Sequence, residues 1–204
     1  MKLGKSSRPA PRKTPEGSVR LIGGRWRGTR LPVLDADGLR PSSDRVRETV
    51  FNWLQFELHG LRVLDAFAGS GALGLEAASR GAAQVFLVER DPRVAAGLQS
   101  SCQRLGAEQV QVIQADVLAW LAQHPALQFD LAFVDPPFAA GLYEPVLRAL
   151  APHLGAGAWL YVELPLSLEL PALPGWRCHR QGETREVRFS LYRHEPADST
   201  DCAP

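Results

Sequence analysis

The sequence predicts an α/β protein built around a mostly parallel sheet, with an antiparallel hairpin at its C-terminal end. Three observations lead to this prediction. From residue 61 onward, short apolar runs alternate with amphipathic segments, which is typical of a parallel sheet covered on both faces. A glycine-rich loop follows the first of these runs, where such sheets bind nucleotides. The last two apolar segments are joined by a turn instead of a helix, which predicts an antiparallel edge.

The chain is expected to begin with a tail and a small hairpin. Residues 1–17 are rich in Lys, Arg, Pro and Ser, a composition typical of disordered segments. Two short apolar segments, 19–22 and 29–33, are separated by glycines. This pattern predicts a β-hairpin ahead of the sheet.

A helix is expected to follow the hairpin. Ser42 or Ser43 can cap it, and it extends to about Leu58. One face of the segment is apolar, so we expect it to pack against a core. That face is formed by Val46, Val50, Trp53 and Leu54. Residues 18–58 are therefore expected to form an N-terminal extension of a hairpin and a helix.

Residues 59–194 are expected to form one sheet domain, followed by a disordered tail over residues 195–204. The expected strands cover residues 61–66, 84–89, 110–113, 129–134 and 158–163, and the expected helices cover residues 72–80, 92–105, 117–123 and 142–153. Segments 175–181 and 185–193 are expected to form the closing hairpin.

Composition excludes several classes of protein. The chain has 204 residues, of which 45% are hydrophobic, which is enough for one substantial core. No apolar run approaches the roughly 18 residues that span a bilayer, and the N-terminus lacks the apolar core of a signal peptide. The three cysteines are widely spaced and the five histidines are scattered. We therefore expect a cytoplasmic protein without disulfides that binds no membrane and no metal.

Positive charge is concentrated in the N-terminal quarter. Residues 1–50 carry a net charge of +7 and the remainder carries −6, although the whole chain is at +1. Arginine predominates in the patterned part of this quarter, and its planar guanidinium binds phosphates and stacks on bases. This favours a nucleic-acid partner over the alternative of a solubilising tail. The candidate contacts are Arg25, Arg27, Arg30, Arg40, Arg45 and Arg47, and Trp26 is either a stacking residue or part of the core.

A glycine loop follows the first expected strand. Gly69, Gly71 and Gly74 form the pattern G-x-G-x-x-G, which lets the backbone turn sharply and approach a ligand closely. Glu89 ends the second expected strand, 20 residues after Gly69, where a carboxylate can bind ribose hydroxyls. By itself this arrangement fits NAD and S-adenosylmethionine (AdoMet) equally well.

Two further carboxylates favour AdoMet. Asp65 ends the strand before the loop, where its charge would oppose a pyrophosphate and favour a sulfonium or an ammonium group. Asp116 follows the third expected strand and can accept a hydrogen bond from an adenine amino group. Its alternative role is the N-cap of the helix that begins at Val117. The two roles of Asp116 are compatible.

The segment Asp135-Pro136-Pro137-Phe138 directly follows the fourth expected strand, at the edge where such sheets bind ligands. Two prolines fix φ and remove two backbone donors, so the segment presents the Asp135 carboxylate and the Pro136 carbonyl as acceptors. Two acceptors can hold both N–H bonds of an exocyclic amino group and aim its lone pair at a methyl group. Phe138 can stack on the base, which is worth roughly 1–3 kcal/mol. The alternative, a tight turn with a buried Phe, is disfavoured by the position behind the glycine loop.

These segments together resemble the bacterial 16S ribosomal RNA guanine-N2 methyltransferases. The similar segments are 22–28, 39–54, 64–76, 88–89 and 133–138, and the resemblance covers about residues 19–193. The glycine loop and the Asp-Pro-Pro-Phe segment occur in many methyltransferases. The two upstream segments are much more specific to this family.

The resemblance implies a class I AdoMet-dependent methyltransferase fold, which is Rossmann-like. It implies transfer of a methyl group from S-adenosylmethionine to guanine N2 in 16S rRNA, within the small ribosomal subunit or an assembly intermediate. Asp135, Pro136 and Phe138 are then expected to hold the target base. The expected cofactor contacts are Asp65, Phe67, Ala68, Gly69, Gly71, Glu89, Arg90, Asp116 and Val117. We expect a monomer.

Three other interpretations compete with this one. An NAD-linked oxidoreductase would use the same glycine loop, but no isolated Lys, His or Tyr is placed for hydride transfer. A non-catalytic RNA-binding protein on a methyltransferase scaffold would not need an intact 135–138 segment. An amino-methyltransferase acting on adenine N6 of DNA or RNA would carry a nearly identical motif, so this alternative remains open.

Overall fold

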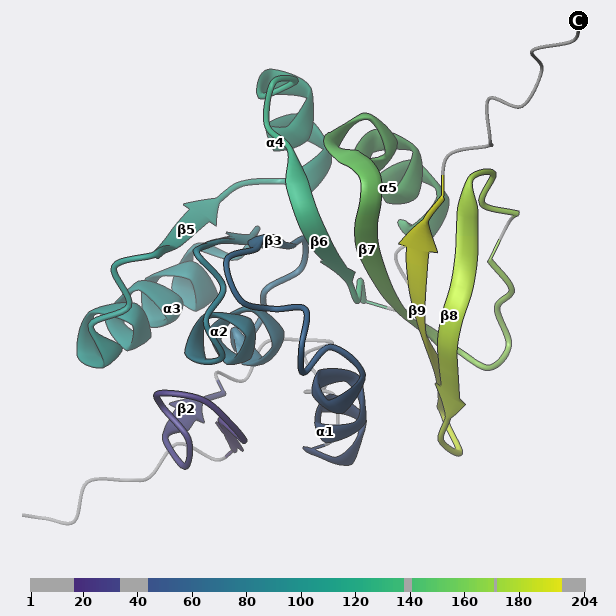
Figure 1. Cartoon of the computed structure of the whole chain (residues 1–204). Helices are drawn as coiled ribbons and strands as arrows, with labels where there is room; N and C mark the ends of the chain where they lie inside the picture. The colour runs from purple at the N-terminus through teal and green to yellow at the C-terminus, as the bar shows by residue number, and fades with distance from the viewer. Residues whose placement is uncertain (1–16, 34–43, 138–140, 171, 196–204) are drawn as a thin grey trace, which may run out of the picture.

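The computed structural model describes residues 17–33, 44–137, 141–170 and 172–195. Its centre is one seven-stranded sheet (Figure 1). In spatial order the strands are β5 (Val110–Gln114), β4 (Gln84–Glu89), β3 (Arg62–Asp65), β6 (Phe129–Val134), β7 (Leu154–Pro165), β9 (Val187–His194) and β8 (Trp176–Glu183). The first five are parallel and β9 is antiparallel to both of its neighbours. The expected mixed sheet is thus confirmed.

Helices cover both faces of the sheet (Figure 1). One face carries α1 (Asp44–Trp53), α2 (Ala72–Ser79) and α3 (Pro92–Leu105), and the other carries α4 (Val117–Gln123) and α5 (Tyr143–Leu150). Successive strand residues belong to opposite cores: Val63 and Phe133 pack on the α1 and α2 side, whereas Leu64 and Val134 pack on the other. This alternation explains why the central strands β3 and β6 are largely apolar, because both of their faces are covered.

The strand order reverses between β3 and β6. The chain moves outward from β3 to β4 and β5, and then returns to place β6 on the other side of β3. The helices that follow β3 and β6 in sequence, α2 and α5, pack on opposite faces of the sheet. A crevice therefore opens beyond the carboxyl ends of these strands. The fold therefore places its ligand cleft there.

The N-terminal hairpin docks on α2 through a buried carboxylate. The hairpin consists of β1 (Ser18–Arg20) and β2 (Arg30–Pro32). Glu76 of α2 is fully buried and accepts hydrogen bonds from the backbone N–H groups of Ile22 and Gly23, each at 2.7 Å. Arg80 donates to the same carboxylate at 2.7 Å. The negative charge thus has three donors, which offset the cost of removing it from water.

A serine one turn further along α2 completes this docking. Ser79 Oγ accepts from the Trp26 N–H at 2.9 Å and donates to the Gly23 carbonyl at 2.6 Å. Gly24 has a φ of 71°, and a Cβ at that position would collide with the Ser79 carbonyl. A glycine is therefore required where the hairpin loop crosses α2.

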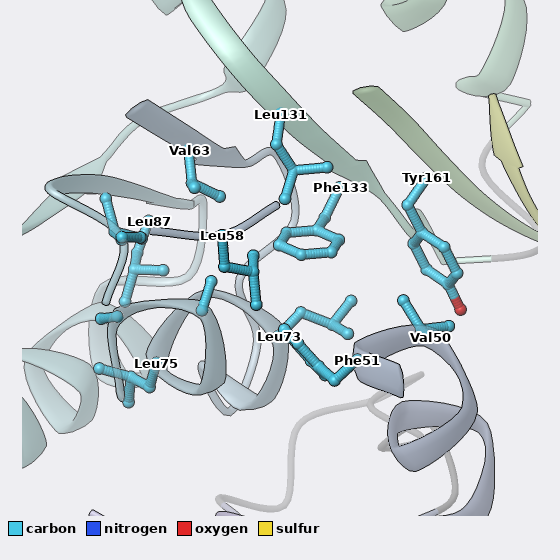
Figure 2. Packing of buried hydrophobic residues seen from close by; sticks show 14 of the residues in the cluster. Val50, Phe51, Leu58, Val63, Leu73, Leu75, Leu87, Leu131, Phe133 and Tyr161 are labelled. Carbon is cyan, nitrogen blue, oxygen red and sulfur yellow. The ribbon is translucent and has the colours of Figure 1, made fainter. Parts of the chain in front are cut away.

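Helix α1 packs its apolar face against the sheet. Figure 2 shows Val50 and Phe51 pointing toward Phe133 and Tyr161 of the central strands. The helix ends at Trp53 instead of Leu58, which corrects the expected boundary. Leu54 and Leu58 are both buried, so the chain leaves the helical path through a turn that brings both side chains to the core. Ser42 and Ser43, the expected caps, lie outside the described residues.

The largest other differences from the expected boundaries concern α5 and β7. The segment expected as one helix over 142–153 is α5 followed by a single 3₁₀ turn, Ala151–His153, because Pro152 has no N–H with which to continue an α-helix. Strand β7 spans twelve residues instead of the expected six, since it pairs with β6 on one side and β9 on the other. Within the described part of the chain, no helix is long and apolar enough to cross a membrane.

Candidate active site

A cleft of about 1170 Å³ lies at the carboxyl ends of β3, β4, β6 and β7. Its walls come from the glycine loop, the residues that end these strands, α1 and the turn between β8 and β9. Small-molecule sites usually enclose about 300–1000 Å³. This cleft is therefore large enough for a nucleoside cofactor with a base beside it.

The glycine loop forms one side of the cleft. Gly69 and Gly71 have φ values of 51° and 78°, in the left-handed region that favours glycine. Gly71 is also the N-cap of α2, so the backbone passes from the loop directly into the helix. A side chain at Gly74 would collide with Leu87 and press on Asp65. The third glycine thus allows α2 to pack closely on the sheet.

Asp65 has a structural role that the sequence did not reveal. The residue is 2% exposed, and its carboxyl accepts hydrogen bonds from the Gly74 N–H at 2.9 Å and from the Phe67 N–H. Burial, opposed by these two donors and reinforced by the charge of Glu89, raises the pKa of Asp65 to about 7. The carboxyl therefore holds the loop in shape while it lines the cleft.

Glu89 and Asp116 line the cleft where β4 and β5 end. The two oxygens of Glu89 accept from the N–H groups of Gly69 at 2.9 Å and Asp91 at 2.8 Å. A carboxylate offers about four acceptor sites, so these bonds orient Glu89 and leave capacity for hydroxyl donors. Asp116 accepts from the Ala119 N–H at 3.1 Å and caps α4. The capping role is thus observed, and a contact with adenine stays a prediction.

Phe67, Ala68, Arg90 and Val117 also line the cleft. Phe67 is half-buried, whereas Ala68 and Val117 are buried and Arg90 is exposed. The structure thus brings eight of the nine expected cofactor contacts to the wall of one cleft. The ninth, Gly71, lies in the loop between two residues that line it. Contact of these residues with a cofactor stays a prediction.

The Asp-Pro-Pro segment follows the strand next to the one that leads into the glycine loop. Asp135 and Pro136 follow β6 directly and line the cleft, with Asp135 half-buried and Pro136 buried. Asp135 is two residues beyond Phe133, which is the register partner of Asp65 in β3. The proposed base-holding acceptors therefore adjoin the loop that is expected to hold the cofactor. Phe138 lies outside the described residues.

The sequence did not single out Glu163, which lies near the end of the adjacent strand. Glu163 in β7 is 5% exposed and lines the cleft beside Asp135. Its Oε2 accepts from the Tyr161 hydroxyl at 2.8 Å, and its backbone carbonyl accepts from the Tyr143 hydroxyl at 3.0 Å. Its position after a buried run is the same signal that identified Asp135. The pattern is harder to recognise at Glu163, because the apolar run does not end there but continues with Leu164 and Pro165.

Arginines at the cleft and on the hairpin lie open to solvent. Arg25, Arg27 and Arg30 are exposed on the hairpin, and exposed Arg45 lines the cleft. The guanidinium of Arg25 lies 5.9 Å from the centre of the Trp26 ring. Arg40 lies outside the described residues.

Two of the expected RNA contacts were wrong. Arg47 is fully buried and donates to the Arg20 carbonyl at 3.0 Å and to Asp44 at 2.6 Å, so its guanidinium is used inside the fold. Trp26 is only 7% exposed and packs in the core beneath the hairpin. Its ring therefore has no open face on which a base could stack, and the alternative place in the core is the correct one.

The chain is similar to proteins of a known family. A family model described as "Conserved hypothetical protein 95" matches residues 19–193. The protein named ribosomal RNA small subunit methyltransferase D from Escherichia coli K12 is 42% identical over 195 residues, which are 94% of this chain and 98% of the relative. The protein of the same name from Haemophilus influenzae is 42% identical over 88% of this chain and 95% of the relative.

Solved structures agree with the fold. The Escherichia coli protein yhhF matches with a TM-score of 0.79 and 42% identity, over 88% of this chain and 99% of that one. The Thermus thermophilus protein TTHA0928 matches with a TM-score of 0.72 and 33% identity, over 85% and 98%. SMU.776, which was solved with SAH, matches with a TM-score of 0.64 over 76% of this chain and 50% of that one; at 16% identity it bears on the fold alone. The expected class I, Rossmann-like fold is confirmed.

Proposed function

Because the chain belongs to the family described as "Conserved hypothetical protein 95", together with relatives named ribosomal RNA small subunit methyltransferase D, we propose that it methylates ribosomal RNA with S-adenosylmethionine. The specific reaction that we propose is transfer of a methyl group to the exocyclic N2 of a guanine in 16S rRNA. The substrate is the small ribosomal subunit or one of its assembly intermediates.

One observation carries the proposal. Asp135 and Pro136 line the same cleft as the glycine loop, on the strand next to the one that ends in Asp65. An amino group held there would lie near a cofactor bound by the loop. A carboxylate and a carbonyl are acceptors only, so this end of the cleft suits a group that donates two hydrogen bonds.

The residues of the cleft fit AdoMet. Glu89 is oriented for ribose hydroxyls by two backbone N–H groups, and Asp116 stands at the wall where an adenine amino group would be bound. Asp65 adds a carboxyl that favours a cation once it is ionised, whereas it would repel the pyrophosphate of NAD. When bound, AdoMet supplies an electrophilic methyl group whose bond to sulfur breaks with its electron pair kept by sulfur.

The chain's own groups position and deprotonate the amine. The Asp135 carboxylate and the Pro136 carbonyl accept hydrogen bonds from the two N–H groups of guanine N2. This holds the nitrogen lone pair in line with the bond between the methyl group and sulfur. As the new C–N bond forms, the nitrogen becomes acidic and one amino proton passes to an Asp135 oxygen. Catalysis therefore comes from orientation and from acceptors fixed in place before the reaction, and the guanine must leave its stack to reach them.

The hairpin arginines are proposed to bind the RNA backbone. Arg25, Arg27 and Arg30 are exposed on a hairpin that α2 fixes in place, and Arg45 extends the positive charge to the cleft. Phosphate contacts of this kind fix the position of the RNA without reading its sequence. The choice of base is then made inside the cleft.

Transfer of a labelled methyl group to small-subunit particles from cells that lack this enzyme tests the proposal. We expect one guanosine to acquire label, and hydrolysis to nucleosides should give N2-methylguanosine. Label recovered as N6-methyladenosine would support the amino-methyltransferase alternative and contradict ours. Saturable NADH binding without AdoMet binding would favour the oxidoreductase instead.

A further inference from the structure

A second carboxylate faces the proposed base site. Glu163 lies in β7, the neighbour of β6, and lines the cleft together with Asp135. Val134 and Val162 are register partners in these parallel strands, so Asp135 and Glu163 are the next residues along two adjacent chains. Parallel neighbours are about 4.8 Å apart. The two acidic residues therefore stand side by side at one end of the cleft.

Both carboxylates emerge on the same face of the sheet. Phe133 and Tyr161, each two residues earlier, pack in the core on the α1 side, and side chains two residues apart on a strand share a face. Figure 2 shows the Tyr161 hydroxyl pointing away from its strand toward α1. The charges of Asp135 and Glu163 both act on the Tyr161 and Tyr143 phenols, as expected if all four groups are close together.

Two tyrosines hold Glu163 from opposite faces of the sheet. Tyr161 donates to its carboxylate at 2.8 Å, and Tyr143 of α5 donates to its backbone carbonyl at 3.0 Å. Burial, with the nearby carboxylates, raises the pKa of both phenols, so both stay protonated donors. A carboxylate held in this way is a rigid acceptor, which is the property that a recognition group needs.

The base that fits two adjacent acceptors is guanine. Its Watson–Crick edge presents N1–H and the N2 amino group side by side, and all of these hydrogens are donated. The corresponding edge of adenine has a lone pair on N1 next to the N6 amino group. A carboxylate oxygen opposite that nitrogen would be repelled by its lone pair and would gain no donor from the base, which is costly in a buried site.

We propose that Glu163 is the residue that selects guanine, by accepting the N1–H while Asp135 and Pro136 hold the N2 amino group. This inference rests on the proposed function, because it requires a base in the cleft. It identifies a recognition residue of the same site. It also gives a physical reason why this cleft would reject adenine although the Asp-Pro-Pro-Phe segment alone accepts either amino group.

A base analogue separates recognition from structure. 2-Aminopurine carries the same 2-amino group as guanine, but its N1 is an acceptor. Small-subunit RNA is ligated with guanosine or 2-aminopurine riboside at the mapped position, assembled into particles, and methylated by the wild type and by Glu163→Gln. The glutamine amide can donate to an N1 acceptor, which the glutamate carboxylate cannot do.

We expect the wild type to prefer guanosine by at least about 100-fold in kcat/KM, since a site built around a donated hydrogen bond rejects an analogue that lacks the hydrogen. In Glu163→Gln this preference should fall at least about tenfold, with part of the change a gain on 2-aminopurine. Tyr161→Phe removes the hydroxyl that holds Glu163 and should lower the preference less. Glu108→Gln, an exposed residue away from the cleft, should leave it unchanged.

The outcomes separate failure of the Glu163 role from failure of the proposed function. If Glu163→Gln binds AdoMet normally and methylates guanosine, but keeps the wild-type preference within about threefold, Glu163 does not read N1 and this inference is wrong. A preference that changes equally in Glu108→Gln would also overturn it. If the wild type transfers no methyl group to the guanosine particle, the proposed function itself fails.

Discussion

Two buried carboxylates in different regions of the molecule have different surroundings. Glu76, beneath the hairpin, is fully buried and is bound by two backbone N–H groups and by Arg80. Glu163 is almost as buried, but it borders a large cleft, and two neutral phenols donate to its carboxylate and its carbonyl. Burial alone therefore does not tell a carboxylate that joins two parts of the fold from one that borders a cleft.

The difference lies in what compensates the charge. Glu76 is balanced by a cation and by main-chain donors that belong to the fold, so its role is to join the hairpin to the sheet domain. Glu163 instead lines a cleft together with Asp65 and Asp135, which Glu89 and Asp116 line as well. Carboxyl groups are acceptors when ionised, so this wall suits a base edge made of donors, and Asp65 favours a cationic cofactor once the pH exceeds its pKa of about 7.

Asp135→Ala tests the cleft side of this comparison with the largest expected effect. It should lower kcat by about 1000-fold, because it removes an acceptor fixed at the reacting amine. RNA affinity should stay within about twofold, since the arginines proposed to bind phosphate are elsewhere. Labelled methyl transfer and filter binding measure the two quantities. Glu108→Ala is the matched control, and a loss of less than about tenfold would contradict the role of Asp135.

Glu76→Ala tests the hairpin side. It should lower the free energy of unfolding by about 3 kcal/mol, because two backbone N–H groups and Arg80 lose a buried partner. Urea denaturation followed by circular dichroism measures this loss. Glu76→Gln keeps the shape of the side chain and should cost less. If Glu163→Gln destabilised the fold as much as Glu76→Ala does, the distinction between the two carboxylates would not hold.

Ionisation of Asp65 makes the stability of the fold depend on pH. Its pKa is raised from 3.8 to about 7, so between about pH 4 and pH 7 the folded chain keeps a proton that the unfolded chain has lost. Stability from this group is therefore greatest at low pH, falls as the pH rises to about 7, and is constant above it.

AdoMet affinity should run the opposite way, because a cation favours the ionised carboxylate. We expect it to rise about tenfold from about pH 6 to about pH 8, in proportion to ionisation of a group with a pKa of about 7. Asp65→Asn retains an oxygen for the Gly74 N–H and should remove most of this dependence. Calorimetric titration at several pH values measures it, and an unchanged slope in the variant would exclude Asp65 as its source.

The hairpin arginines should give the smallest effect. Arg25→Ala and Arg27→Ala should each weaken RNA binding a few-fold and lower the slope of log affinity against log salt by about 1. Arg177→Ala is the matched control, because Arg177 is also exposed but lies on β8 in an ion pair with Glu195. If the salt dependence of RNA affinity were the same in all three variants, the RNA would not contact Arg25 or Arg27.

Much of the fold could be predicted because the relevant signals are local. Strands β4 and β6 and helices α3 and α4 have the expected limits, since apolar runs, an N-capping aspartate and a helix-ending glycine act over a few residues. The glycine loop and the Asp-Pro-Pro segment could be placed at one edge because the carboxyl ends of parallel strands meet there. Helix α1 could not be bounded, because Leu58 packs in a core formed by distant segments.

The sequence by itself determined the sheet class, the order of its elements and the local chemistry of the loops that end the strands. Only the tertiary structure decided how each charged or aromatic side chain is used. Arg47 and Trp26 look like RNA contacts in sequence but are buried, while Glu163 looks like an ordinary strand residue but lines the cleft. The physical reason is that exposure and electrostatic environment depend on neighbours brought together by folding, and no local pattern encodes those neighbours.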